Sequence, residues 1–107
     1  MKNIDYIPVK NHWFEMYTQF EKPYWEPKEK LLIKKIRINK DLFDYQNVVD
    51  EAEVLFMLMN FDRDAWMPIT INKDFFLIDG QHRLSFAKKM GLKFIDVVIQ
   101  DTELLEN

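Results

Sequence analysis

The chain contains only two glycines, and they lie on either side of one ten-residue segment, Gln81–Met90. Gly91 has the place of the residue just past a helix C-terminus, where a left-handed backbone is needed. Gly80 follows an apolar stretch typical of a buried strand, at a tight turn that something else can approach closely. Lys88 and Lys89 suit the last turn of a helix, because cations are favoured there. The sequence therefore predicts a strand, a sharp turn at Gly80 and a helix over 81–90.

Arg83 falls in the middle of the apolar face of this predicted helix. At 100° per residue, the face expected to meet the core contains Leu84, Phe86, Ala87 and Met90. The opposite face contains Gln81, Ser85, Lys88 and Lys89, with His82 at its edge. An inward guanidinium needs a partner, and a cation in the first turn opposes the helix dipole. Either a bound anion or a nearby carboxylate such as Asp79, Asp62 or Asp64 would supply that partner.

The anion alternative makes Gly80, Gln81, His82 and Arg83 a candidate phosphate site, because free N–H groups at a helix start and a bidentate guanidinium bind phosphate. His82 is either a hydrogen-bond donor or proton carrier there, or a structural residue. Asp79 binds Mg²⁺ that accompanies the phosphate or acts as a base, or else it caps the turn. The two histidines are far apart and lack metal-ligand spacing, so a protein-only metal site is not expected.

Composition excludes several classes of function. The 107 residues fit one domain, and the absence of cysteine excludes a disulfide framework, a thiol nucleophile and an iron–sulfur cluster. The longest apolar run, Val54–Met59, is far shorter than the ~20 residues of a spanning helix. With no apolar leader near the N-terminus, the protein is expected to be cytoplasmic, with no membrane partner. The net charge of −3 makes DNA an unlikely partner on its own. There is no Rossmann or P-loop glycine motif.

Residues 1–30 form an aromatic arm that precedes a domain spanning 31–107. Trp13, Met16, Tyr17 and Phe20 recur with the spacing of one helix face. The arm either packs on the domain and enlarges its core, or offers an aromatic surface to a partner. Six basic residues between Lys28 and Lys40 belong either to a solvated strand face or to a nucleic-acid patch.

The first part of the domain reads as a strand over Leu31–Ile38 and a helix over Asn47–Met59 with Asn47 as its N-cap. The expected buried stripe of this helix is Val48, Ala52, Leu55 and Met59. Further apolar residues lie off the stripe, so either the aromatic arm or a second subunit is expected to cover the helix, the latter as a homodimer through Val54–Met59. A hairpin over 68–78 turns at Asn72-Lys73-Asp74, and Ile95–Ile99 is the last strand.

The run Ile78-Asp79-Gly80-Gln81-His82-Arg83-Leu84-Ser85-Phe86-Ala87, followed by Gly91 and the strand Ile95–Ile99, resembles the ParB/sulfiredoxin superfamily. The order of the upstream strand, helix and hairpin agrees, and the resemblance covers residues 31–99. It implies an α/β (α+β) domain with a small mixed sheet and two main helices. It also implies that the Gly-x-His-Arg turn holds nucleotide phosphates.

Departures from the superfamily patterns narrow the function. Sulfiredoxins have a catalytic cysteine where this chain has Gln81, so sulfinic-acid reduction is excluded. Chromosome-partition ParB proteins carry Gly-Glu-Arg-Arg and a downstream DNA-binding domain that this sequence does not include, so centromere binding is not expected. The form Asp-Gly-x-His-Arg is similar to that of free-serine kinases. That similarity implies catalytic roles for Asp79 and for a carboxylate before the first helix, which we assign to Asp44, with Glu51 and Asp41 as alternatives. His82 completes the candidate catalytic set as the residue that donates a hydrogen bond or transfers a proton.

Three functions follow from these observations. The first is a nucleotide-binding domain that uses ATP, ADP or CTP with Mg²⁺ as a nucleotide hydrolase or small-molecule kinase. The second is a non-catalytic nucleotide-sensing or protein-interaction module. The third is a DNA-associated, nuclease-type protein, which the acidic composition disfavours.

Overall fold

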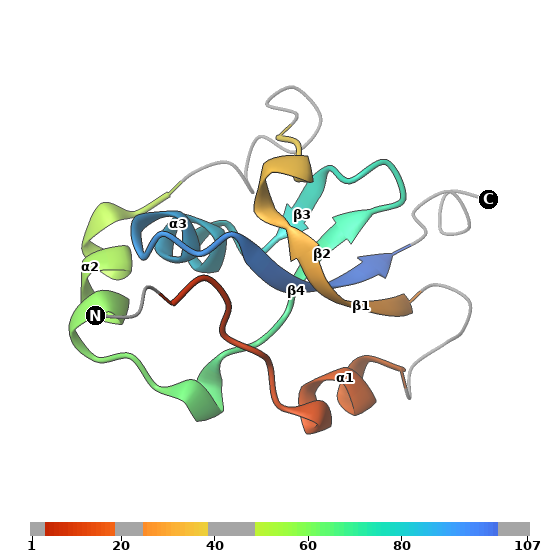
Figure 1. Cartoon of the computed structure of the whole chain (residues 1–107), viewed down its shortest axis with the longest axis horizontal. Coiled ribbons are helices and arrows are strands. Elements are labelled where there is room, and N and C mark those ends of the chain that lie inside the picture. The colour runs from red at the N-terminus through yellow and green to blue at the C-terminus, as the bar shows by residue number, and fades with distance from the viewer. Residues whose placement is uncertain (1–3, 19–24, 39–48, 101–107) are drawn as a thin grey trace.

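The computed structural model describes residues 4–18, 25–38 and 49–100 (Figure 1). Within these ranges the chain forms three α-helices and a four-stranded mixed sheet, an α+β fold. The helices are α1 (Asn11–Thr18), α2 (Glu51–Met59) and α3 (Gln81–Lys89). The strands are β1 (Trp25–Leu32), β2 (Ile69–Asn72), β3 (Leu77–Asp79) and β4 (Phe94–Gln100). Two short 3₁₀ helices are η1 (Ile33–Lys35) and η3 (Arg63–Ala65). None of the helices in these ranges is long and apolar enough to cross a membrane.

The sheet has the strand order β1-β4-β2-β3, with β4 antiparallel to β1 and parallel to β2. Strands β2 and β3 form the predicted hairpin, and the Asn72 side chain accepts hydrogen bonds from the N–H groups of Asp74 and Phe76 in its turn. The central position of β4 agrees with its apolar sequence, because strands inside a sheet are rich in apolar residues. Its residues Ile95, Val97 and Val98 are all fully buried. The helices α2 and α3 lie side by side at one end of the sheet (Figure 1).

Asp96 is a buried charge in the middle of β4, with 1% of its surface exposed. Its carboxylate accepts hydrogen bonds from the Tyr6 hydroxyl at 2.6 Å, the Val9 N–H at 2.7 Å and the Lys30 N–H at 2.8 Å. Burial, together with this hydrogen bond and the Asp96 charge, raises the pKa of Tyr6 above its ordinary value. One side chain thus ties the N-terminal segment and β1 to the centre of the sheet.

The predicted strand over Leu31–Ile38 is wrong in position. Strand β1 runs over Trp25–Leu32, where Leu32 pairs with Phe94, the first residue of β4. Beyond that pair β4 offers no further partner, and the chain turns into η1. Pro27 is tolerated because β1 is an edge strand. Strand β1 also runs across residue 30, where the sequence suggested that an arm ends and a domain begins.

The predicted start and buried face of the second helix are also wrong. Helix α2 begins at Glu51, and the carboxylate of Asp50 caps it by accepting a hydrogen bond from the Ala52 N–H at 3.0 Å. Ala52 is exposed, as are Leu55 and Met59, the latter two at 56% and 74%. The fully buried residue is Val54, with partly buried Met57 and Leu58 packed against the core. Both stripes have helical spacing, and packing on α3 selects the second. Asn47 and Val48 lie outside the described residues.

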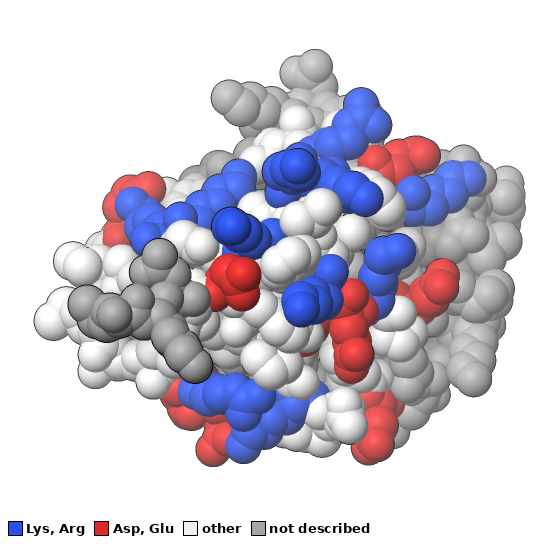
Figure 2. All heavy atoms as spheres, in the orientation of Figure 1, with Lys and Arg blue, Asp and Glu red and all other residues white. Residues whose placement is uncertain are grey.

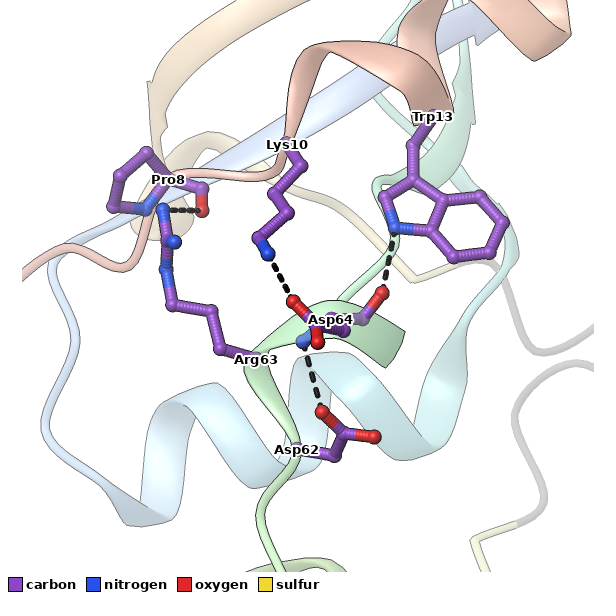
Figure 3. A network of polar contacts seen from close by, with 6 residues as sticks. All are labelled: Pro8, Lys10, Trp13, Asp62, Arg63 and Asp64. Carbon is purple, nitrogen blue, oxygen red and sulfur yellow. Dashed lines mark hydrogen bonds and ion pairs between the residues drawn. The ribbon is translucent and has the colours of Figure 1, made fainter.

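Polar contacts hold the N-terminal segment against η3 (Figure 3). Lys10 forms an ion pair with Asp64, the Trp13 indole N–H donates to the Asp64 carbonyl at 3.0 Å, and Arg63 donates to the Pro8 carbonyl at 2.9 Å. The Lys10 hydrogen bond lowers the pKa of Asp64. Two buried residues of this segment, Val9 and Phe14, belong to the hydrophobic core.

Candidate functional site

Gly80 is the N-cap of α3 and has a left-handed backbone, with φ of 103°. A Cβ at this position would lie 2.6 Å from Cγ2 of Ile69 in β2. Contact with Ile69 therefore accounts for the close approach that the sequence predicted at this turn. The left-handed conformation predicted for Gly91 is confirmed, with φ of 77°.

The predicted helix at 81–90 is confirmed as α3, which ends at Lys89. Leu84, Phe86 and Ala87 are buried as expected. Met90 is 43% exposed, so its predicted place in the core is wrong, because the helix ends one residue earlier and Met90 is its C-cap. The Phe86 ring stacks on that of Phe61, with ring centroids 5.1 Å apart. These contacts fix the orientation of α3 and therefore the direction of Arg83.

Arg83 faces inward as the helical spacing predicted, with 17% of its side chain exposed. Its Nη1 donates to the Pro68 carbonyl at 2.9 Å, and its Nη2 lies 3.7 Å from a carboxylate oxygen of Asp79. Asp79 is thus the carboxylate near the guanidinium, whereas Asp62 caps η3 and Asp64 pairs with Lys10. One full hydrogen bond and one long ion pair leave most of the five guanidinium donors without a partner among the described residues.

The start of α3 also has free backbone donors. The first intrahelical bond runs from the Leu84 N–H to the Gly80 carbonyl at 2.9 Å. Gly80 has no side chain with which to cap the helix. Within 4–18, 25–38 and 49–100, no acceptor is hydrogen-bonded to the N–H groups of Gln81, His82 or Arg83. The positive end of the helix dipole therefore lies beside the Arg83 guanidinium.

His82 connects the start of α3 to the start of α2. Its Nε2 accepts a hydrogen bond from the Asp50 N–H at 3.0 Å and lies 3.2 Å from a carboxylate oxygen of Glu53. A second link joins the same helices, since Lys89 forms an ion pair with Glu51 at 3.1 Å. The imidazole is partly buried, with 25% of the side chain exposed. Its Nε2 is therefore engaged with α2.

Asp79 is the last residue of β3, and 66% of its side chain is exposed. It is the sequence-predicted metal ligand, but the described part of the chain has no group of three or more His, Cys, Asp or Glu side chains suited to a metal ion. Asp44 and its alternative Asp41 lie outside the described residues, and Glu51 is paired with Lys89. The structure thus brings Asp79, Gly80, Gln81, His82 and Arg83 together at one turn and leaves Asp44 undescribed.

The sequence prediction of the site missed Asp50, Glu53 and the carbonyl of Pro68. An acidic residue followed three positions later by glutamate is a helix-start signal, and the pair Asp50 and Glu53 carries it. That signal competed with Asn47 as the predicted N-cap. Nothing in the sequence indicated that His82, 32 residues away, would contact this helix start.

No protein-family model matches the sequence, and no curated protein matches it. Solved structures do match. The C2221 form of a pNOB8-like ParB N-domain superposes with a TM-score of 0.56 at 19% identity over 78% of this chain, and a second pNOB8-like ParB N-domain structure with 0.54 at 21% over 81%. Sulfiredoxin from Arabidopsis thaliana superposes with 0.55 at 22% identity, over 76% of this chain and 93% of its own. The chain has a ParB/sulfiredoxin-like fold.

This result confirms the resemblance stated from the sequence at the level of fold, and with it the mixed sheet of an α+β domain. The chain spans 32% of the length of each of these two ParB chains. Its own sequence contains no cysteine.

Proposed function

We propose that this ParB/sulfiredoxin-like domain binds a phosphate-bearing ligand, a nucleotide, at the start of α3. The observation that carries the proposal is the Arg83 guanidinium, which faces inward at the start of α3. Among residues 4–18, 25–38 and 49–100 it makes only one full hydrogen bond, and the three backbone N–H groups beside it make none. A cation at the positive end of a helix is unfavourable by itself. A phosphate bound between them would neutralise both positive charges and accept their hydrogen bonds.

In this proposal each residue of the turn has a separate task. Arg83 binds phosphate oxygens with the donors that Pro68 leaves free. The backbone N–H groups of Gln81 and His82 donate hydrogen bonds to a second phosphate oxygen. Asp79, exposed and only 3.7 Å from the guanidinium, is available to hold Mg²⁺ carried by ATP, ADP or CTP, or to act as a base. Nucleotide hydrolysis, or transfer of a phosphoryl group to a small molecule, would require one of these two roles of Asp79.

Calorimetric titration with ATP, ADP and CTP, each with and without Mg²⁺, tests the proposal. The informative variant is Arg83→Gln, and the matched control is Lys88→Gln, an exposed cation on the same helix far from its start. Hydrogen bonds to charged groups contribute about 1.5–3 kcal/mol, so Arg83→Gln is expected to weaken binding about 10- to 100-fold. Lys88→Gln is expected to leave the affinity within about twofold, because Lys88 lies in the last turn of α3, away from the free N–H groups at the start of the helix.

Two results would overturn the proposal. One is that the wild-type protein binds none of the three nucleotides. The other is that Arg83→Gln and the control bind equally well while both retain the wild-type unfolding temperature. Turnover of a bound nucleotide would support the enzyme, and binding without turnover would support a sensing module. Salt-sensitive binding to DNA without nucleotide binding would favour the DNA-associated alternative instead.

A second candidate function, association with another copy of this chain, is favoured by the exposed face of α2. Leu55, Phe56 and Met59 are 56%, 65% and 74% exposed, and Phe61 next to them is 39% exposed. A hollow of about 220 Å³ between α2 and η3 continues this surface, lined mainly by Phe56, Met57, Phe61 and Trp66. The part of α2 from Val54 to Met59 has no charged side chain, so burying that part against a second copy would desolvate no charge of its own.

The size of this surface makes a weak homodimer the expected form. Stable interfaces bury about 800 Å² per partner, which four exposed apolar side chains do not reach. Sedimentation velocity between micromolar and millimolar protein is expected to show a concentration-dependent dimer that Phe56→Ser abolishes. Met90→Ser, which removes an exposed apolar residue at the far end of α3, is the matched control and should dimerise like the wild type. A monomer at every concentration would exclude this candidate.

A further inference from the structure

The Nε2 atom of His82 has two neighbours that require opposite states of the same nitrogen. The Asp50 N–H lies 3.0 Å away and donates to it, which requires an unprotonated Nε2 with a free lone pair. A carboxylate oxygen of Glu53 lies 3.2 Å away and can only accept, which requires a proton on Nε2. One nitrogen cannot satisfy both neighbours at once. The two contacts therefore belong to two protonation states of the imidazole.

We infer that His82 is a positioning residue that holds the start of α2 against α3 when neutral and releases the Asp50 N–H in favour of Glu53 when protonated. Histidine is the side chain whose charge normally changes between about pH 5 and 8. In the neutral state, the proton resides on Nδ1 and Nε2 caps the backbone N–H of Asp50. In the charged state, the Nε2–H points at Glu53, and the Asp50 N–H turns to solvent.

Among the described residues, the other acidic groups on the facing elements are already engaged, which leaves Glu53 as the partner of the imidazolium. On α2, the Asp50 carboxylate accepts the Ala52 N–H at 3.0 Å and Glu51 pairs with Lys89 of α3 at 3.1 Å. On the side of α3 and β3, Arg83 and Asp79 lie 3.7 Å from each other. The hydrogen bond from Asp50 and the ion pair with Glu53 therefore exclude each other at Nε2 of His82.

The change is confined to the first turn of α2. Val54, fully buried, anchors the helix one turn further on, so protonation loosens the helix start without detaching the helix. The switch depends only on the contact between α2 and α3, and it holds whether or not the start of α3 binds a nucleotide. One consequence does rest on the proposed function: a charged His82 beside Arg83 strengthens the attraction of an anion at this turn.

Proton and nitrogen NMR of the full chain between pH 5 and 8 tests the inference. The Asp50 amide signal is expected to move with the same midpoint as the His82 ring, and His82 is expected to carry its proton on Nδ1 at pH 8. Protection of the Asp50 amide against hydrogen exchange, corrected for intrinsic rates, should fall about three- to tenfold on protonation. His12, whose ring lies against that of Trp13 with centroids 4.6 Å apart, supplies an internal reference that Asp50 should not follow.

Two variants distinguish a switch from a structural role. In His82→Gln an amide oxygen can still accept the Asp50 N–H but does not titrate, so Asp50 should stay protected and become independent of pH. In Glu53→Gln the imidazolium loses its charged partner, while the neutral Nε2 still faces the Asp50 N–H, so the cap at pH 8 should survive. Unchanged Val54 signals in both variants would report an intact fold.

The inference is overturned if the Asp50 amide is insensitive to pH between 5 and 8 in the wild type. It is equally overturned if Asp50 still follows pH in His82→Gln, or if Glu53→Gln abolishes the protection of the Asp50 amide at pH 8. Titrating ADP at pH 5.5 and at pH 8 separates this result from the proposed function. Absence of binding at both values would remove the nucleotide site and leave the switch supported by the Asp50 data alone.

Discussion

Replacing Asp96 by alanine is expected to remove a large part of the folding free energy. The carboxylate is 1% exposed and accepts two backbone N–H groups, those of Val9 and Lys30, that cannot be redirected. A buried donor left without an acceptor costs about 1–3 kcal/mol, which applies in full to the buried Val9 N–H and only in part to the partly buried Lys30 N–H, so the two contribute about 2–4 kcal/mol. The Tyr6 hydroxyl is only partly buried and can turn to water, so it adds little. Domains of this size are typically stable by about 5–15 kcal/mol, which makes the variant marginal.

Urea unfolding followed by tryptophan fluorescence measures this loss. The matched control is Asp74→Ala in the exposed turn between β2 and β3, which is expected to change stability by less than about 0.5 kcal/mol. Asp96→Asn is a sharper variant, because one carboxylate oxygen accepts from Tyr6 and Lys30 and the other from Val9 alone. An asparagine that keeps the first pair presents its NH₂ to Val9, so amide protection should be lost there and retained at Lys30. If Asp96→Ala unfolds within 1 kcal/mol of the wild type, the carboxylate does not anchor the N-terminal segment.

Two further changes test the backbone turn and the alkaline limit of stability. Gly80→Ala should lower the unfolding temperature more than Gly91→Ala, because both have positive φ, costing about 1–2 kcal/mol, but only the Cβ at position 80 would strike Ile69 at 2.6 Å. Equal effects would mean that the packing of β2 against this turn is unimportant. Burial raises the pKa of Tyr6, so the folded chain keeps a proton that the unfolded chain releases near pH 10. The contribution of Tyr6 to the free energy of unfolding is therefore fully present below pH 10 and is lost as the pH rises beyond it. Urea midpoints at pH 8 and pH 11 should show that Tyr6→Phe removes this part of the alkaline loss, and an unchanged alkaline slope would contradict it.

The sequence predicted the elements that are bounded by recognisable turn or capping residues. Helix α3 has a glycine on each side, and the β2–β3 hairpin has a polar turn at Asn72. The apolar run of β4 identified a central strand. Strand β1 could not be placed in the same way. Its end is set by the residue at which β4 begins, and not by the alternation of apolar and polar residues in its own sequence.

The same division between local and distant information applies to the site. The inward direction of Arg83 follows from helical spacing alone, and the structure confirms it. The carboxylate of Asp96 in an apolar strand can be expected to need hydrogen-bond partners. One of them, Tyr6, is 90 residues away, and nothing in the sequence around Tyr6 indicates this contact. The contact of His82 with Asp50 depends on how two helices pack, which neither helix encodes by itself.

Amide chemical shifts during titration with ADP and Mg²⁺ examine the phosphate site at the atoms that are proposed to form it. The N–H signals of Gln81, His82 and Arg83 are expected to move first and furthest, and inorganic tripolyphosphate should move the same three signals. Arg83→Gln should suppress these shifts, while Lys88→Gln should leave them in place. Nucleotide-induced shifts confined to other parts of the chain, or none at millimolar ligand, would contradict phosphate binding at the start of α3.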